Sequence, residues 1–225
     1  MKPFEIKAQK DHLEKISHSK PQFALSEIVW NALDADATRI DISSNYNELG
    51  IIDKISVTDN GSGIPYDLAE KYFSSLGGSW KIQELKSPKG RQLHGKQGQG
   101  RFKAFSLGHN VDWHVRYLHT DGAVYEFDIF GDEANLNEFN ITDRTESNQK
   151  ETGVTVEITN IAKQFGLFEN GSLANTFSTL FAPYLYSYKD ICISINDIPI
   201  DISSQIQKLI DYDLVSVVEN QDTVF

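Results

Sequence analysis

Three polar side chains are spaced so that one helix would bring them together. Glu27, Asn31 and Asp34 stand at positions i, i+4 and i+7 of the stretch SEIVWNALDADAT, and residues at such spacings share a helix face. A carboxylate held near a phosphate group can accept a proton from an attacking water molecule. The amide oxygen of asparagine is a suitable ligand for Mg²⁺, which keeps several waters when it binds a protein. An ordinary solvated helix face would show the same three residues, so both interpretations stay open on the spacing alone.

A second group of residues follows a predicted strand. Asp59 ends an alternating segment and stands directly before NGSGIP. A buried carboxylate at this place could accept a hydrogen bond from an exocyclic amine such as that of adenine. Gly61 and Gly63 permit unusual backbone torsions and leave room for a ring to lie against the chain. The alternative is an Asp-Asn-Gly turn at the end of a strand, which is common without any ligand.

A third group consists of closely spaced glycines. Gly95, Gly98 and Gly100 precede a predicted helix that begins near Arg101. Such glycines let phosphate groups approach the backbone, and the unpaired N–H groups at a helix start favour anions. The spacing differs from that of the dinucleotide-binding fingerprint, and the GK[ST] of a P-loop is missing. The alternative is a polar loop without a ligand.

Hydrophobic periodicity predicts the elements that must position these residues. Strands joined by hairpins, with helices grouped before and between them, indicate an α+β fold: a two-layer sandwich in which a mixed, mostly antiparallel sheet carries helices on one face. Helical periods are found over residues 21–37, 65–81, 101–108 and 172–188. Alternating segments predict strands over residues 38–44, 51–59, 111–118, 123–131 and 154–158, and two short strands over 190–202.

Composition excludes several classes of protein. Of the 225 residues, 40% are hydrophobic and 24% are charged, which is typical of a folded protein. A net charge of -11 opposes a nucleic-acid-binding surface over the whole chain. No apolar stretch is long enough to cross a bilayer, so we expect no membrane contact. Cys192 is the lone cysteine, so no intrachain disulfide can form and we expect a cytoplasmic protein.

Taken together, the three groups resemble the motifs of the GHKL ATPases. This superfamily includes gyrase-type topoisomerases, ninety-kilodalton heat-shock chaperones, histidine kinases and MutL mismatch-repair proteins, and its ATP-binding module is the Bergerat fold. EIVWNALDADAT is similar to the first motif of the MutL and microrchidia proteins, and DNGSGIP to the second. GKQGQGRFKAF has the glycine spacing of the chaperones' third motif, and SLGGSWK resembles the start of the lid in microrchidia-type ATPases. The resemblance covers most of the chain.

The resemblance implies a role for each candidate residue. Glu27 would be the general base, Asn31 would coordinate Mg²⁺, and Asp34 would support the nucleotide pocket through a water molecule. Asp59 would accept the hydrogen bond of the adenine amine. The residues implied to lie near the base are Gly61, Gly63 and Ile64, and those implied to wrap or neighbour the triphosphate are Gly95, Gly98, Gly100, Arg101 and Lys103. Arg101 and Lys103 could equally be solvated residues of a first helical turn.

The fourth motif departs from the family pattern. The family has Gly-Thr, and its threonine helps to hold the water and the aspartate on the adenine side. This chain has ETGVTVEI, so Val154 follows Gly153. Thr155 would point to the strand face opposite Val154. Either Thr152 takes the place of the family's threonine, or that hydrogen bond is missing.

The resemblance also implies how the chain is organised and what it does. We expect an ATP-binding domain over residues 1–205, with a lid over about residues 66–100, and a C-terminal segment 206–225 that could begin a further domain. The module would bind ATP and ADP with Mg²⁺, hydrolyse ATP, and undergo ATP-dependent homodimerisation. It would reach nucleic acid only through a domain beyond this chain. Two alternatives stay open: a nucleotide-gated switch with little hydrolysis, and a histidine kinase-like catalytic domain.

Overall fold

The computed structural model describes residues 17–74, 86–94, 100–161 and 166–206, together with residues 13 and 15 and the pairs 218–219 and 222–223. Within these residues, nine strands form one sheet. They are β1 (Arg39–Tyr46), β2 (Ile52–Asp59), β3 (Gly108–Leu118), β4 (Val124–Asp132), β5 (Phe139–Ile141), β6 (Thr145–Glu146), β7 (Gly153–Ile161), β8 (Cys192–Ile195) and β9 (Ile198–Pro199).

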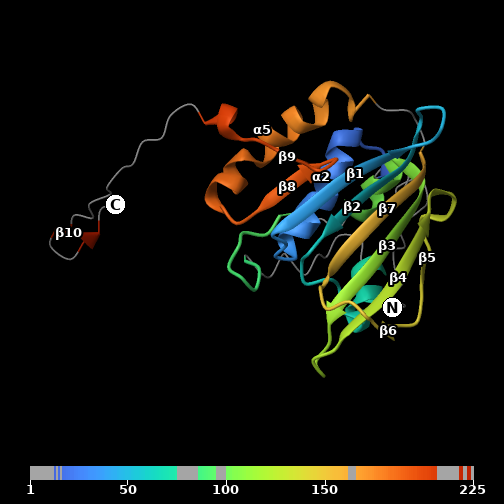
Figure 1. Ribbon diagram of the computed structural model, residues 1–225. Coiled ribbons are helices and arrows are strands. Elements are labelled where there is room, and N and C mark those ends of the chain that lie inside the picture. The colour runs from blue at the N-terminus through green and yellow to red at the C-terminus, as the bar shows by residue number, and fades with distance from the viewer. Residues whose placement is uncertain are drawn as a thin grey trace, which may run out of the picture.

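The sheet is mixed and mostly antiparallel, as predicted. Its order is β5-β4-β3-β7-β2-β1-β8-β9, with β6 paired to β4 (Figure 1). β1 runs parallel to β8, whereas the other pairings within this sheet are antiparallel. Two further strands, β10 (Val218–Glu219) and β11 (Asp222–Thr223), pair with each other in a separate small sheet.

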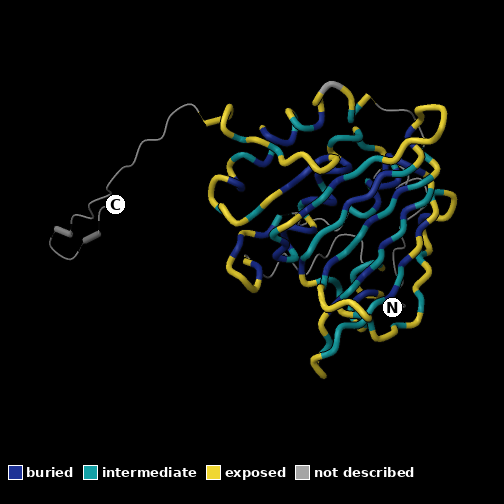
Figure 2. The backbone as a smooth tube through the Cα atoms, viewed as in Figure 1, coloured by how far each residue is buried: buried dark blue, intermediate teal, exposed yellow. Residues whose placement is uncertain are grey.

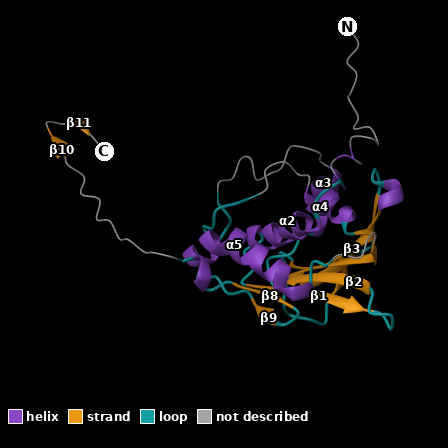
Figure 3. Ribbon diagram, turned by 90° about the horizontal axis from the view of Figure 1, so that it is seen from above, coloured by secondary structure: helices purple, strands orange, loops and turns teal. Residues whose placement is uncertain are grey.

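The helices form a second layer over one face of the sheet. They are α2 (Pro21–Asp34), α3 (Tyr66–Ser74), α4 (Gly100–Lys103) and α5 (Ser172–Ser187). Seen from above, α2 and α5 lie together as a layer over the strands (Figure 3). The predicted two-layer α+β sandwich is therefore confirmed.

The core lies between these two layers because the strands alternate as their sequences predict. Val111, Trp113, Val115 and Tyr117 of β3 are buried, whereas the residues between them are only partly buried. In Figure 2 buried segments run through the centre of the sheet, and exposed segments lie at its rims and loops. The apolar stripe of α2 completes the core from above with Leu25, Ile28, Val29, Ala32 and Leu33.

The helix predicted over residues 21–37 ends three residues early. α2 stops at Asp34, and Asp36 has a φ of 61°, which a right-handed helix cannot continue. The N–H group of Ala37 donates to the carbonyl oxygen of Ala32 at 3.1 Å. The DADA sequence is therefore a helix-ending turn, and its carbonyl oxygens at Ala35 and Ala37 accept hydrogen bonds from Ser62 and Arg91.

The helix predicted over residues 101–108 is also shorter. α4 covers four residues and passes into a 3₁₀ turn over Ala104–Ser106. Gly108 does not stop a helix but opens β3. A Cβ atom on Gly108 would lie 2.4 Å from the carbonyl oxygen of Thr159, so the glycine permits close pairing with β7.

Other differences concern short or partly described segments. α3 confirms the start of the helix predicted over residues 65–81, and residues 75–81 lie outside the described part of the chain. The predicted helix over 172–188 is α5, which continues through Pro183. β5 and β6 are too short to show an alternating pattern and were not predicted.

Candidate functional site

The three polar residues of α2 lie in different surroundings along the helix. Asp34 is buried, Glu27 is partly buried and Asn31 is exposed. These surroundings suit different roles, because a buried carboxylate can anchor backbone, whereas an exposed amide can reach a ligand. The predicted helix therefore holds all three residues, but it does not present them as one uniform face.

Glu27 faces the one-turn helix α4. Lys103 Nζ donates a hydrogen bond to Glu27 Oε1, and the two side chains form an ion pair. A Cβ atom placed on Gly100 would lie 3.1 Å from Glu27 Oε2 and 3.4 Å from Asn31 Nδ2. A larger side chain at position 100 would thus crowd both residues of α2. The structure brings the predicted base, the predicted metal ligand and two residues of the third motif into one place.

Asp34 holds the chain just before the glycine-spaced segment. Its Oδ1 atom accepts a hydrogen bond from the backbone N–H group of His94 at 2.8 Å. The His94 ring stacks on Trp30, one helical turn before Asp34, with 3.8 Å between the ring centroids. A water-mediated role for Asp34 stays a prediction, but its direct contact holds the backbone of His94 in place. Gly95 and Gly98 lie outside the described residues.

The same segment is anchored by the helix-ending turn that follows α2. Ser87 Oγ donates to Asp36 Oδ1 at 2.5 Å, and the N–H group of Lys89 donates to Asp36 Oδ2 at 3.1 Å. Arg91 donates to the carbonyl oxygen of Ala37 at 2.6 Å. Asp36 and Arg91 were missed by sequence reasoning. The positive φ of Asp36 is a conformation that aspartate tolerates better than most residues, but no pattern revealed its distant partners.

Asp59 ends β2 on the side of the sheet that faces the helices. Its Oδ1 atom accepts the N–H group of Gly61 at 2.7 Å. Burial raises the pKa of the Asp59 carboxyl group to about 6, while hydrogen bonds from the backbone of Gly61 and Val154 and the charge of Arg116 oppose the rise. The group is therefore mainly ionised at pH 7 and able to accept a hydrogen bond.

The turn after Asp59 docks on the end of α2. Ser62 donates its N–H group to the carbonyl oxygen of Ala35 at 2.8 Å, and a Cβ atom on Gly61 would lie 2.7 Å from the same oxygen. Asn60 Oδ1 accepts the N–H groups of Thr38 and Arg39, each at 2.8 Å. Glycine at position 61 is thus required by close approach, and the first and second motifs are in direct contact.

The next glycine of this motif packs against a different strand. Gly63 has a φ of 70°, and a Cβ atom there would lie 2.0 Å from the carbonyl oxygen of Arg116 on β3. Ile64 is partly buried against the core. Both residues lie near the Asp59 turn, but the structure also gives them a packing role that needs no ligand.

The two threonines of the fourth motif have different partners, Thr152 just before β7 and Thr155 within it. Thr152 Oγ1 donates to the carbonyl oxygen of Gly61 at 2.7 Å. Thr155 instead lies 3.2 Å from Thr58, between their hydroxyl oxygens, on the face of the sheet away from the helices. Thr152 is therefore the threonine that contacts the Asp59 turn, through a backbone carbonyl group.

Arg101 and Lys103 supply positive charge beside these residues. Burial lowers the pKa of Arg101 to about 10, so its guanidinium group stays protonated at pH 7. The guanidinium carbon lies 4.4 Å from the centroid of the Phe102 ring. Lys103 pairs with Glu27, so it is not a simple solvated residue of a first helical turn.

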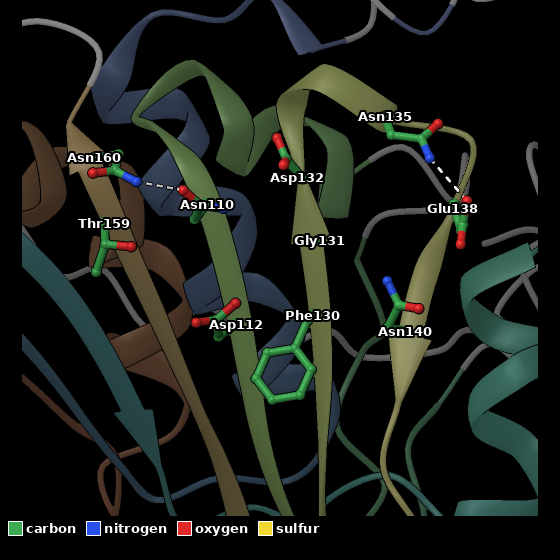
Figure 4. Close-up of a pocket in the computed structure, with 10 residues that line it drawn as sticks. All are labelled: Asn110, Asp112, Phe130, Gly131, Asp132, Asn135, Glu138, Asn140, Thr159 and Asn160. Atoms are coloured by element: carbon green, nitrogen blue, oxygen red, sulfur yellow. Dashed lines mark hydrogen bonds between the residues drawn. The ribbon is translucent and has the colours of Figure 1, made fainter.

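A separate pocket of about 560 Å³ lies on the other face of the sheet (Figure 4). Its walls are mostly amide and carboxylate side chains, with hydrogen bonds between Asn110 and Asn160 and between Asn135 and Glu138. It is lined by Asn110, Asp112, Phe130, Gly131, Asp132, Asn135, Glu138, Asn140, Thr159 and Asn160. None of the candidate residues belongs to it, so this pocket is distinct from the site around α2.

Comparison with known proteins identifies the family of the chain. No curated protein matches the chain. No helix in the described residues has the length and apolar character needed to span a membrane. A family model described as "Histidine kinase-, DNA gyrase B-, and HSP90-like ATPase" matches residues 18–164, a span that includes every candidate residue. Because this match covers more than half of the chain, the protein belongs to the family of histidine kinase-, DNA gyrase B- and HSP90-like ATPases.

Proposed function

We propose that the chain binds ATP with Mg²⁺ and hydrolyses it, and that closure over the nucleotide drives a conformational change or dimerisation in a larger protein. Membership of the family supports ATP binding and hydrolysis in general terms. The assignment of roles to residues rests on two contacts that lie at different points along α2. Gly100 lies against Glu27 and Asn31, and the Asp59 turn docks on Ala35. Ala35, which caps α2, stands eight positions after Glu27, so the two contacts are separated by about 12 Å along the helix axis, a distance on the scale of a nucleoside triphosphate.

The adenine base would bind at the Asp59 end of the site. An ionised, largely desolvated carboxylate accepts the exocyclic amine strongly because little water competes for it. Two backbone N–H groups, from Gly61 and Val154, already orient the carboxylate. Thr152 holds the carbonyl group of Gly61 and so supports the same turn.

The phosphate groups would bind at the Gly100 end. Arg101 and Lys103 provide cations there, and Gly100 lets α4 lie close to Glu27 and Asn31. Asn31 is exposed and offers one amide oxygen. That donor set suits Mg²⁺, which takes few protein ligands and binds phosphate oxygens and waters instead. When bound, the ion would neutralise part of the phosphate charge.

Glu27 would act on the attacking water. The water oxygen forms a bond to the γ-phosphorus while a water proton moves to the Glu27 carboxylate. The bond from the γ-phosphorus to the bridging oxygen breaks, and its electron pair leaves with ADP. Inorganic phosphate is the second product, and Glu27 then returns its proton to solvent.

The test is the substitution Glu27→Gln, which keeps the shape of the side chain and removes the base. We expect ATP to bind still and the rate of phosphate release to fall at least about 100-fold. Glu157→Gln is the control, because Glu157 forms a Lys–Glu pair on the opposite face of the sheet. Unchanged phosphate release from Glu27→Gln would rule out the assignment of the base.

A second candidate is a nucleotide-gated switch that hydrolyses ATP slowly. The observation that favours it is the ion pair between Glu27 and Lys103, because one carboxylate oxygen is already engaged. The two candidates differ in a single-turnover experiment with protein in excess over ATP. A switch would keep bound ATP intact over many minutes, whereas the hydrolase would convert it to ADP.

A further inference from the structure

We propose that Lys103 restrains the Glu27 carboxylate while the site lacks nucleotide, and moves to the terminal phosphate of ATP when that nucleotide binds. The exchange would free Glu27 for the attacking water only when a γ-phosphate is present. This inference rests on the proposed function, because it assigns Glu27 as the base and the Gly100 end as the phosphate end.

The Glu27 carboxylate lies against α4. Lys103 Nζ donates to Oε1, and the position of a Cβ atom on Gly100 lies 3.1 Å from Oε2. Gly100 and Lys103 are three residues apart in one helical turn, so they lie on the same side of α4. Each oxygen of the carboxylate therefore meets one end of the same short helix.

The contact with Lys103 hinders Glu27 from acting as a base. An oxygen that accepts a hydrogen bond from an ammonium group is less available to accept a proton from water. The Lys103 and Glu27 side chains are 29% and 27% exposed, so the pair is accessible from solvent. An incoming anion can therefore reach the Lys103 ammonium group without unfolding of the helix layer.

The terminal phosphate of ATP would compete with the Glu27 carboxylate for Lys103. A terminal phosphate carries more negative charge than a carboxylate, and a lysine ammonium group is a compact charge on a flexible stem that can be redirected without backbone movement. ADP has no γ-phosphate. Lys103 would thus distinguish ATP from ADP and couple that distinction to the release of Glu27.

The chain supplies a matched control for an ordinary ion pair. Lys54 Nζ lies 2.7 Å from Glu157 Oε1, and these side chains are 32% and 29% exposed. The pair joins β2 to β7 on the face of the sheet away from the helices. Its chemistry and exposure match those of the Lys103 pair, but it lies far from the proposed phosphate end.

The experiment measures the affinity of the full chain for Mg²⁺–ADP and for a nonhydrolysable ATP analogue by calorimetry. Lys103→Met should weaken binding of the analogue about tenfold, the size of one charge-assisted contact, and change ADP affinity less than about twofold. Lys103→Arg should keep the preference for the analogue. Lys54→Met should change neither affinity.

A second variant separates the exchange of Lys103 between Glu27 and phosphate from electrostatic repulsion between Glu27 and the phosphates. Glu27→Gln should tighten analogue binding roughly two- to fivefold, because Lys103 is no longer held. The same substitution also removes a negative charge near the phosphates, and this effect alone would tighten binding in any background. Glu27→Gln combined with Lys103→Met distinguishes the two, because exchange predicts a smaller tightening relative to Lys103→Met than Glu27→Gln gives relative to the wild type.

The proposal is overturned if Glu27→Gln tightens analogue binding as much in the Lys103→Met background as in the wild type, or if a folded Lys103→Met protein binds ADP and the analogue equally weakly relative to the wild type. If Lys103→Met does not fold, Lys103→Arg decides: loss of the preference for the analogue in that variant overturns the proposal, and retention supports it. Failure of the proposed function looks different, since the wild-type chain would bind neither nucleotide.

Discussion

The hydroxyl group of Thr152 donates a hydrogen bond to the carbonyl oxygen of Gly61 at 2.7 Å, and this contact joins the start of β7 to the turn after Asp59. The next residue strengthens the junction, since a Cβ atom on Gly153 would lie 2.0 Å from the carbonyl oxygen of Asp59. The threonine that contacts the proposed adenine end is therefore Thr152, which precedes Gly153. In the family pattern the threonine follows the glycine of the fourth motif.

Thr152→Val tests this junction. Valine has the shape of threonine but cannot donate to the Gly61 carbonyl group. We expect the free energy of unfolding to fall by about 1 kcal/mol and nucleotide affinity to fall several-fold, measured by urea denaturation and calorimetry. Thr152→Ser should restore both, and Thr155→Val should leave nucleotide affinity unchanged. A Thr152→Val variant with wild-type affinity would contradict the role given to this threonine.

Asp59 gives a prediction with a defined dependence on pH. Burial raises the pKa of its carboxyl group from 3.8 to about 6 in the folded protein. The stability that this group contributes is fully present below pH 3.8 and is lost as the pH rises through 6, because the folded state holds the proton longer than the unfolded state. The loss is on the order of 3 kcal/mol. Asp59→Asn cannot titrate and should lack this part of the pH profile.

The same substitution should separate stability from binding. At about pH 7.5 the Asp59→Asn protein should be more stable than the wild type, because no charge is buried. Its amide oxygen would face the N–H groups of Gly61 and Val154, so its NH₂ group would face the adenine amine and binding should be lost. Denaturation curves at about pH 4, 6 and 7.5, which span the titration of Asp59, together with nucleotide calorimetry check both parts. Wild-type binding by this variant would refute the adenine role.

Local patterns in the sequence predicted the parts of the site that depend on nearby residues. The helical period placed Glu27 and Asn31 on one helix, and the strand alternation placed Asp59 at a strand end. The open choice between Thr152 and Thr155 needed the structure, because both residues are close to Gly153 in the sequence. The partner of Thr152 is 91 residues away, and only the folded sheet brings it near.

Contacts between distant segments could not be predicted for the same reason. Lys103 and Glu27 are 76 residues apart, and Arg91 and Ala37 are 54 apart. The end of α2 was predicted too late because Asp36 adopts a left-handed conformation that its neighbours in the sequence do not signal. Its buried side chain is instead satisfied by Ser87 and Lys89, which hydrophobic periodicity does not detect.

Arg91 is the main anchor of the segment that leads to the glycine-spaced region. Its side chain is 5% exposed and reaches two separate elements. One nitrogen donates to the carbonyl oxygen of Ala37 at 2.6 Å, and another donates to Asp190 Oδ2, three residues after α5, at 2.9 Å. His94, which Asp34 holds, follows three residues later, so the position of this region depends on the anchor.

Arg91→Met should therefore loosen the segment and weaken nucleotide binding together. We expect a loss of about 2 kcal/mol in the free energy of unfolding, since one buried and one partly buried hydrogen bond disappear, and faster thermolysin cleavage near the buried Leu93. Arg39→Met is the control, because Arg39 is 56% exposed and its pairs with Asp41 and Glu151 lie on the surface. ATP should protect the wild type from cleavage more than it protects Arg91→Met. If Arg91→Met is cleaved no faster than Arg39→Met, the segment does not depend on this anchor.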